Sequence, residues 1–199
     1  MINPIKIAVD AMGGDNSPSK IIEGISIHEK ESENINYKIF GDESLIKPLI
    51  NKYKVPSNKI QIIHTDKFVE GEDSALSAAK KGKDTSLWLA INSVKNGESD
   101  VIVSAGNTGA LFVIAKLNLN MIENIDKPAL SGLWPNKNGM NIVLDLGANI
   151  DCNEKNLEDF SLMGSALFKA LFDNEVAKVA LLNIGSEELK GNNVIKNTF

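Results

Sequence analysis

Residues 5–16, IKIAVDAMGGDN, join a short apolar run to a polar loop that contains two glycines. The run 5–10 has the length and composition of a buried strand, and a loop follows it directly. Ser17 and Pro18 come next, and we expect Ser17 to cap a helix whose first residue is Pro18. A strand, a glycine loop and a helix in this order are the first unit of an α/β fold.

The same alternation continues along the chain. We expect further strands at residues 37–40, 60–63, 100–103, 129–134, 141–145 and 179–184, and helices at residues 42–50, 72–81, 85–95, 154–172, from about 110 and from about 192. Residues 135–139, PNKNG, predict a hairpin turn. Strands that alternate with helices imply a mainly parallel sheet covered by helices on both faces. Because no internal linker is evident, we expect one α/β domain over residues 1–199.

Bulk composition narrows the class of protein. The 199 residues include 21 Lys and Arg and 26 Asp and Glu, which gives a net charge of −5. This balance argues against a nucleic-acid partner. One cysteine, Cys152, excludes a disulfide within the chain and suits a reducing cytoplasm. The longest apolar stretch, residues 110–115, is too short to cross a bilayer, so we expect a cytoplasmic protein.

Familiar catalytic motifs are missing from the sequence. It has no phosphate-binding P-loop, no G-x-G-x-x-G after the first strand, no G-x-S-x-G, no H-E-x-x-H and no C-x-x-C. Two histidines are too few for a typical zinc site, and we expect neither a metal nor an organic cofactor. No His–Asp pair accompanies Cys152, which favours an inert packing role for it.

Four loops that follow predicted strands share one composition. They are residues 10–16 (DAMGGDN), 104–109 (SAGNTG), 145–151 (DLGANID) and 183–191 (NIGSEELKG). Each contains glycine, which lets the backbone approach a ligand closely. Three precede predicted helices, whose N-terminal amides and dipole favour an anion. The loops therefore predict a phosphate or oxyanion site, although glycine at such turns can also serve chain geometry alone.

Lys80, Lys81 and Lys83 form the one dense basic cluster in the sequence. One interpretation is a solvated helix end favoured by the helix dipole. The other is a docking patch for an acidic partner, or a phosphate contact. The sequence leaves both interpretations open.

The motifs IAVDAMGGD, VSAGNTGAL, LDLGANID and LLNIGSEELKG resemble those of the bacterial fatty acyl–acyl-carrier-protein:phosphate acyltransferases, the PlsX family, in order and in approximate spacing. The resemblance covers essentially the whole chain. It implies a fold similar to that of phosphate acetyltransferases and isocitrate dehydrogenases. It also implies transfer of a long-chain acyl group from acyl carrier protein to inorganic phosphate, which yields an acyl phosphate for phospholipid biosynthesis.

The resemblance carries further implications for assembly and location. Family members are homodimers, either cytosolic or loosely attached to the membrane, and their product feeds a membrane glycerol-3-phosphate acyltransferase. They are also longer, so we expect this chain to be an incomplete catalytic domain. Two local departures from the family pattern occur, one before the basic cluster and one within it. The family's Ser-Pro is replaced by Ser74-Ala75, and a continuous basic run is interrupted by Gly82.

The same resemblance suggests a mechanism and a set of site residues. Phosphate is already an anionic nucleophile, so it can attack the thioester directly once it is held in place. We expect Asn107, Thr108 and Asp10 to be the catalytic residues, the first two as donors and Asp10 as a residue that orients the loops. Substrate binding is expected at Gly13, Gly14, Asp15, Gly106, Gly109, Asp145, Asn149 and Lys190, and carrier-protein docking at Lys80, Lys81 and Lys83.

Two other functions stay open at this point. One is transfer of a short acyl group from acetyl-CoA to phosphate. The other is a non-catalytic fragment that binds an anion or another protein without turnover.

Overall fold

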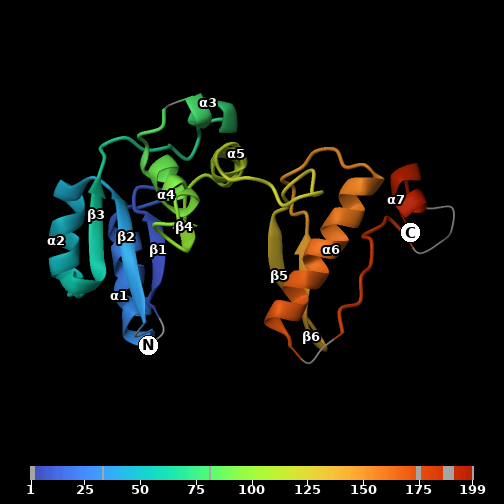
Figure 1. Cartoon of the computed structure of the whole chain (residues 1–199), viewed down its shortest axis with the longest axis horizontal. Coiled ribbons are helices and arrows are strands. Elements are labelled where there is room, and N and C mark those ends of the chain that lie inside the picture. Colours follow the sequence, from blue (N-terminus) through green and yellow to red (C-terminus); the bar gives the residue numbers. More distant parts are fainter. Residues whose placement is uncertain (1–2, 33, 81, 174–175, 186–190, 199) are drawn as a thin grey trace. The chain divides into compact units, whose positions relative to one another are not determined.

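The computed structural model describes residues 3–32, 34–80, 82–173, 176–185 and 191–198. The chain divides into two compact units, Met1–Asn120 and Met121–Phe199, which we call unit 1 and unit 2 and describe separately (Figure 1). The expectation of one domain over the whole chain stays a prediction, because a compact unit is not necessarily a domain that folds alone.

Unit 1 is built on a parallel four-stranded sheet with the strand order β3-β2-β1-β4 (Figure 1). The strands are β1 (Ile5–Asp10), β2 (Ile35–Gly41), β3 (Ile60–His64) and β4 (Val101–Ser104). Ile7 of β1 pairs with Tyr37 on one side and with Val101 on the other. The predicted α/β class with a parallel sheet is confirmed. The central position of β1 accounts for the apolar run that opens the chain.

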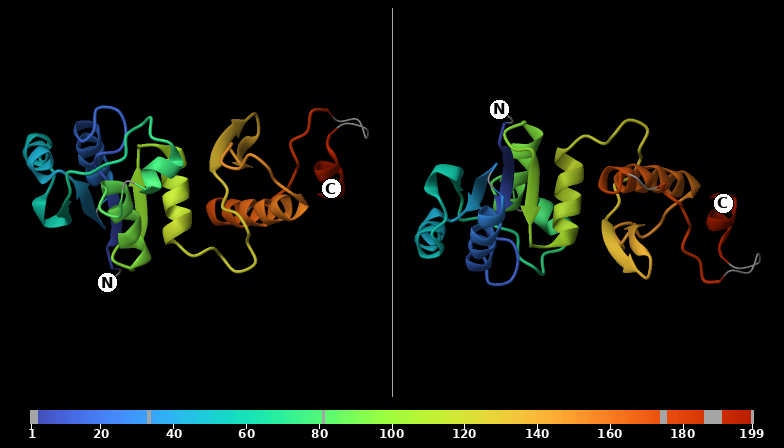
Figure 2. Two further views of the ribbon diagram at one scale, coloured as in Figure 1. Left: turned by 90° about the horizontal axis from the view of Figure 1, so that it is seen from above. Right: turned by 90° about the horizontal axis from the view of Figure 1, so that it is seen from below.

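Helices cover both faces of this sheet (Figure 2). On one face lie α1 (Ser19–Glu31) and α2 (Glu43–Tyr53), and on the other lies α4 (Ser86–Lys95). Val9 packs with Ile22 of α1, whereas its neighbour Ala8 packs with Ala90 of α4. Successive strand residues therefore contact opposite helical layers. A 3₁₀ turn, η1 (Ser57–Lys59), precedes β3, and α3 (Ala75–Lys80) packs on α5 (Thr108–Asn118).

The positions of the helices follow from the handedness of parallel connections. The chain moves outward from β1 to β2 and then to β3, and right-handed crossovers place α1 and α2 on one face. It then returns across the sheet to β4, on the other side of β1, and the same handedness places α4 on the opposite face. The order therefore reverses between β1 and β4. Open α/β sheets bind ligands at such a reversal, beyond the carboxyl ends of the strands.

Unit 2 contains an antiparallel hairpin and two helices. The hairpin consists of β5 (Ser131–Asn136) and β6 (Gly139–Leu144), joined through Lys137 and Asn138, and the helices are α6 (Glu154–Leu171) and α7 (Asn193–Thr198). The predicted hairpin is confirmed, and β6 packs against α6. None of the helices in the described ranges is both long and apolar enough to cross a bilayer.

Three local predictions are wrong. Residues 179–184 form no strand. Leu182 and Ile184 among them are 93% and 85% exposed, so these apolar side chains lack the burial that favours a strand. Ser17 does not cap α1, which begins at Ser19, because the Ser17 hydroxyl instead donates to the Gly13 carbonyl at 2.6 Å. The helix predicted over residues 72–81 starts later than expected, at Ala75.

Candidate functional site

Two glycine loops meet where the strand order reverses. Residues 11–16 follow β1, and residues 105–107 follow β4 beside it. A Cβ atom added to Gly106 would lie 3.0 Å from the Gly13 Cα, and one added to Gly13 would lie 3.1 Å from the Gly106 Cα. Both neighbours are backbone atoms, which cannot give way as the end of a side chain can. Glycine at both positions therefore allows the two backbones to touch.

Gly14 extends this contact along the first loop. Its φ is +92°, in the left-handed region that favours glycine, and an added Cβ would lie 2.4 Å from the Ala105 carbonyl oxygen. Gly14 and its neighbour Asp15 are exposed, whereas Gly13 is buried. The loop thus presents the backbone next to Gly14 to solvent while Gly13 packs inward.

The carboxylate of Asp10 joins three elements beneath the loops. It is 2% exposed, and its Oδ1 accepts a hydrogen bond from the Ser86 hydroxyl at 2.6 Å and one from the Met12 amide at 3.3 Å. Its Oδ2 accepts from the Ser104 hydroxyl at 2.8 Å, and the Gly106 amide donates to that same hydroxyl at 3.2 Å. Both oxygens are occupied, so this geometry gives Asp10 an orienting role rather than contact with a ligand.

The N-terminus of α5 lies directly after the contact between the loops. Asn107 is the N-cap, and its Oδ1 accepts the Ala110 amide at 3.0 Å. The amides of Thr108 and Gly109 belong to the first turn, where a helix offers no carbonyl partner, and both residues are exposed. Amides in this position, together with the helix dipole, favour an anion.

The amide group of Asn107 also connects α5 to the segment before α3. Its Nδ2 donates to the Gly71 carbonyl at 2.9 Å and to the Asp73 carbonyl at 2.8 Å. A side-chain amide has two hydrogens, so both are used. Asn107 therefore serves as a bridge in this structure, and the backbone amides of Thr108 and Gly109 are better placed than its side chain to hold a phosphate.

A second carboxylate organises the loop after β6 in unit 2. The Asp145 Oδ1 accepts the amides of Leu130 at 3.0 Å and of Ala148 at 3.2 Å. Its Oδ2 accepts the Asn149 amide at 2.7 Å and the Asn149 Nδ2 at 2.9 Å. Asn149 also donates to the Pro128 carbonyl at 2.9 Å. Burial raises the pKa of Asp145, but these hydrogen bonds outweigh it and leave the pKa below its ordinary value.

The predicted site residues therefore fall into four groups, of which the basic cluster is described below. Unit 1 brings the first group together at the reversal point, and it comprises Asp10, Gly13, Gly14, Asp15, Gly106, Asn107, Thr108 and Gly109. Asp145 and Asn149 form a separate network within unit 2. Lys190 and Lys81 lie outside the described residues.

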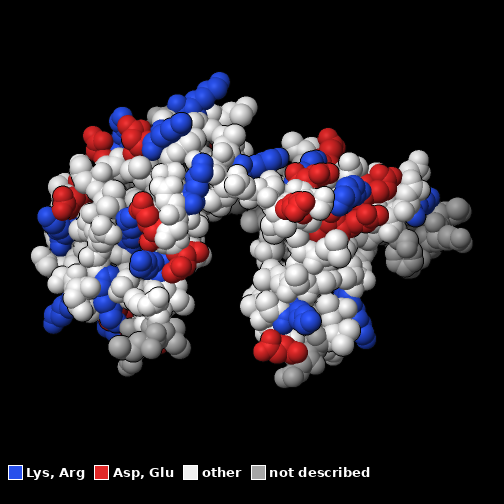
Figure 3. Space-filling view, in the orientation of Figure 1, with Lys and Arg blue, Asp and Glu red and all other residues white. Residues whose placement is uncertain are grey.

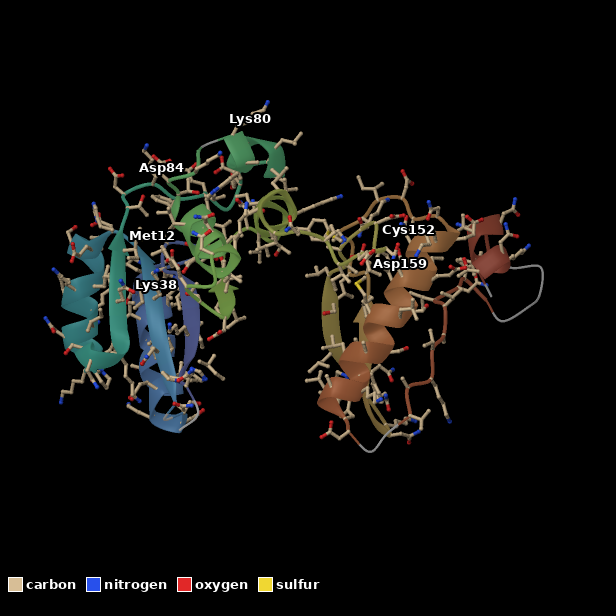
Figure 4. The ribbon with its side chains drawn as sticks, viewed as in Figure 1. Met12, Lys38, Lys80, Asp84, Cys152 and Asp159 are labelled. Carbon is tan, nitrogen blue, oxygen red and sulfur yellow. The ribbon has the colours of Figure 1, made fainter. Side chains whose placement is uncertain are left out.

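The basic cluster lies on and after α3. Lys80 ends α3 and extends outward from it (Figure 4), and Lys83 is exposed in the next turn. Neither forms an ion pair with any residue that the structure describes. The acidic residue that follows them, Asp84, pairs with Lys67 instead. Lys80 and Lys83 therefore keep their positive charge available to a partner.

Sequence reasoning missed Ser86, although its hydroxyl is one of the donors to Asp10. The one local signal is a pair of hydroxyl residues at the start of a helix. Thr85 by itself explains this pair, because it is the N-cap of α4 and its Oγ1 accepts the Trp88 amide. The pattern therefore gives no reason to assign a role to Ser86. The partner of Ser86 lies 76 residues away, and no local pattern could have identified it.

Comparisons with known proteins agree on one family. The sequence model of the family described as fatty acid synthesis protein matches residues 5–199. The phosphate acyltransferase of Pelagibacter ubique is 65% identical over 195 residues, which are 98% of this chain and 58% of that protein. The phosphate acyltransferases of Paramagnetospirillum magneticum and Rhodopseudomonas palustris are 40% and 44% identical, over 96% and 98% of this chain and 55% and 56% of theirs. The chain thus spans little more than half the length of these relatives.

The contact between the glycine loops predicts an asymmetry between two nearby glycines. Gly106→Ala places a methyl group against the Gly13 backbone, and we expect it to reduce the free energy of unfolding by about 1–3 kcal/mol. Gly109→Ala meets only ordinary contacts, at 3.4 Å from the Asn107 Oδ1 and 3.7 Å from the Ala75 Cβ. It should be neutral or stabilise by up to ~1 kcal/mol, because alanine favours a helix. Urea unfolding followed by circular dichroism tests both, and equal effects would contradict the proposed contact.

The lowered pKa of Asp145 predicts a pH-dependent contribution to stability. An aspartate in the unfolded chain ionises at about pH 3.9, above the folded pKa. The stabilisation is therefore present above that pH and is lost as pH falls through the folded pKa. We expect Asp145→Asn to melt below the wild type at neutral pH and the gap to close in acid. Asp151→Asn, in the same loop, removes an exposed carboxylate and should show no such trend. A gap for Asp145→Asn that is constant with pH would refute the prediction.

Proposed function

Because the chain belongs to the fatty acid synthesis protein family, we propose that the protein transfers a fatty acyl group to inorganic phosphate. The observation that carries the proposal is the meeting of two glycine loops at the reversal of the sheet, where Gly13 touches Gly106 beside the exposed first turn of α5. Several relatives are named phosphate acyltransferase, and this chain spans 58% or less of those compared above. The activity and the substrates are therefore proposed for the protein at its full length.

In this proposal the phosphate is held mainly by backbone groups. The amides of Thr108 and Gly109 and the exposed backbone at Gly14 provide donors and a helix dipole at one place. The hydroxyl of Thr108, exposed at the same turn, adds a side-chain donor. Backbone donors are fixed by the fold, so they need little reorganisation when charge develops during the reaction.

The reaction needs no nucleophile from the protein. A phosphate oxygen attacks the carbonyl carbon of the thioester, a C–O bond forms and the C–S bond breaks. The sulfur leaves as a thiol with the proton that phosphate gives up, and an acyl phosphate remains. The protein's contribution is to hold the phosphate oxygen next to the face of the thioester carbonyl and to stabilise the oxyanion that forms on the carbonyl oxygen.

The proposed acyl donor is a long-chain acyl group on acyl carrier protein, an acidic partner. The part of unit 1 that carries α3 shows both basic and acidic side chains (Figure 3), and Lys80 and Lys83 there are not paired with described acidic residues. Asn107 connects this part to the N-terminus of α5 through Gly71 and Asp73. A carrier bound at α3 would thus dock on a segment that is held to the phosphate site. We include in the same proposal a homodimer and delivery of the product to a membrane acyltransferase.

An assay of product formation tests the function. The protein at its full length is incubated with phosphate and either long-chain acyl carrier protein or acetyl-CoA, and acyl phosphate is trapped with hydroxylamine. We expect product from the long-chain substrate, with saturation in phosphate. Turnover of acetyl-CoA alone would establish short-chain transfer instead. Phosphate binding without any product would favour a non-catalytic anion-binding protein.

Carrier docking is tested by reversing two charges. We expect Lys80→Glu combined with Lys83→Glu to raise the KM for acyl carrier protein about tenfold at low salt, because an attractive surface becomes repulsive. The effect should shrink as salt increases, and the KM for phosphate should not change. The control is Lys30→Glu combined with Lys95→Glu, which changes the net charge by the same amount at two exposed residues in the last turns of α1 and α4. Equal effects of both changes would show that net charge, rather than this surface, governs binding.

A further inference from the structure

Ser86 is a buried serine whose hydroxyl is directed to the site rather than to its own helix. It is the first residue of α4 and 1% exposed, and its hydroxyl donates to the Asp10 Oδ1 at 2.6 Å. Thr85 already caps the helix, so α4 does not need the Ser86 hydroxyl at its N-terminus. The Ser86 amide is also satisfied, by the Lys67 carbonyl at 2.9 Å. The hydroxyl therefore has one described partner, which is Asp10.

The contact with Asp10 reaches both glycine loops. Asp10 Oδ1 takes the Ser86 hydroxyl and the Met12 amide, and Met12 begins the turn into Gly13. The other oxygen, Oδ2, accepts a hydrogen bond from the Ser104 hydroxyl, and that hydroxyl accepts one from the Gly106 amide. An added Cβ on Gly13 would lie 2.5 Å from Asp10 Oδ2, so the carboxylate also packs directly against the first loop. A shift of Asp10 would consequently move both sides of the contact between the loops.

The charge of Asp10 makes the Ser86 hydroxyl important for an anion in particular. A buried carboxylate beneath an anion site repels the anion, and hydroxyl dipoles that donate to the carboxylate offset part of that repulsion. Without Ser86, Oδ1 would keep only the longer bond from the Met12 amide, at 3.3 Å. The cost would fall on phosphate, which carries negative charge, and much less on a neutral thioester.

We propose that Ser86 is a positioning residue for phosphate, which acts through Asp10 to hold the two glycine loops in the arrangement that binds the anion. The inference rests on the proposed function for its kinetic test. It assigns a role to a residue of α4 that lies outside the glycine loops. Ser86 touches no substrate in this proposal, and its effect is transmitted by the carboxylate.

The same helix supplies a matched control. Ser93 of α4 is also buried, at 3% exposed, and its hydroxyl also has a side-chain partner, Ser99 at 2.9 Å. Ser93 lies seven positions further along the helix, near its C-terminus, and its partner Ser99 lies beyond the helix, so the pair does not involve Asp10. Ser86→Ala and Ser93→Ala therefore remove the same group from the same helix, and they differ in whether the hydroxyl reaches the site.

The kinetic experiment compares these two variants in the protein at its full length. We expect Ser86→Ala to raise the KM for phosphate about tenfold, the effect of losing one hydrogen bond to a charged group, and to leave the KM for the acyl donor within about twofold. Ser93→Ala should leave both values unchanged even if it lowers the Tm equally. Ser86→Cys, which keeps a weaker donor, should give an intermediate phosphate KM. An unchanged phosphate KM in Ser86→Ala, or the same change in Ser93→Ala, would overturn the proposal.

A second measurement separates this inference from the proposed function. Hydrogen exchange of the segments 11–16 and 104–109 requires no turnover, and we expect it to be faster in Ser86→Ala than in Ser93→Ala. A wild type without acyl-phosphate formation overturns the proposed function, and faster exchange would still support the positioning role. Equal exchange in the two variants would overturn the positioning role. If Ser86→Ala does not fold, Ser104→Ala removes the opposite donor to Asp10 and should show the same selective loss of phosphate affinity.

Discussion

The direct contact between the backbones at Gly13 and Gly106 is the constraint on which unit 1 depends. Strands β1 and β4 are neighbours, but the chain leaves them toward helices on different sides of the sheet. Such a divergence normally opens a crevice that side chains or a ligand fill. Here two glycines bring the loops together, and the Asp10 carboxylate fixes them from below. The exposed amides at the start of α5 are left at the edge of that closed contact.

A site made mainly of backbone groups, as proposed here, would explain why the sequence has no familiar catalytic motif. Donors supplied by a loop and a helix start need no particular side chain, so their signature is a set of glycines and a capping residue. In the proposed site, the important side chains act one step away from the ligand. Asp10 and Asn107 hold loops to one another. Both carboxylate oxygens of Asp10 and the side-chain amide nitrogen of Asn107 are used in these contacts.

Local sequence features predicted local structure well. The apolar run of β1, the hairpin between β5 and β6, and the helix that follows residues 104–107 were all evident, because periodicity and turn residues act over a few positions. The errors share a cause. Residues 179–184 have the composition of a strand but form none, and Ser17 looks like a cap but bonds to Gly13 instead. The roles of Ser86 and of the Asn107 amide depend on groups tens of residues away, which a single sequence does not reveal.

The long separations within the Asp10 network bear on the order of folding. Its two hydroxyl donors lie 76 and 94 residues along the chain from the carboxylate. Bringing together residues so far apart in the sequence costs conformational entropy before the contacts between them offset it. Parallel sheets form slowly for this reason. Until Ser104 has joined the sheet, the loop after β1 lacks the partner that fixes it. The contact between the two glycine loops is therefore expected to form late in folding, after β4 has joined the sheet, and the proposed anion site would form with it.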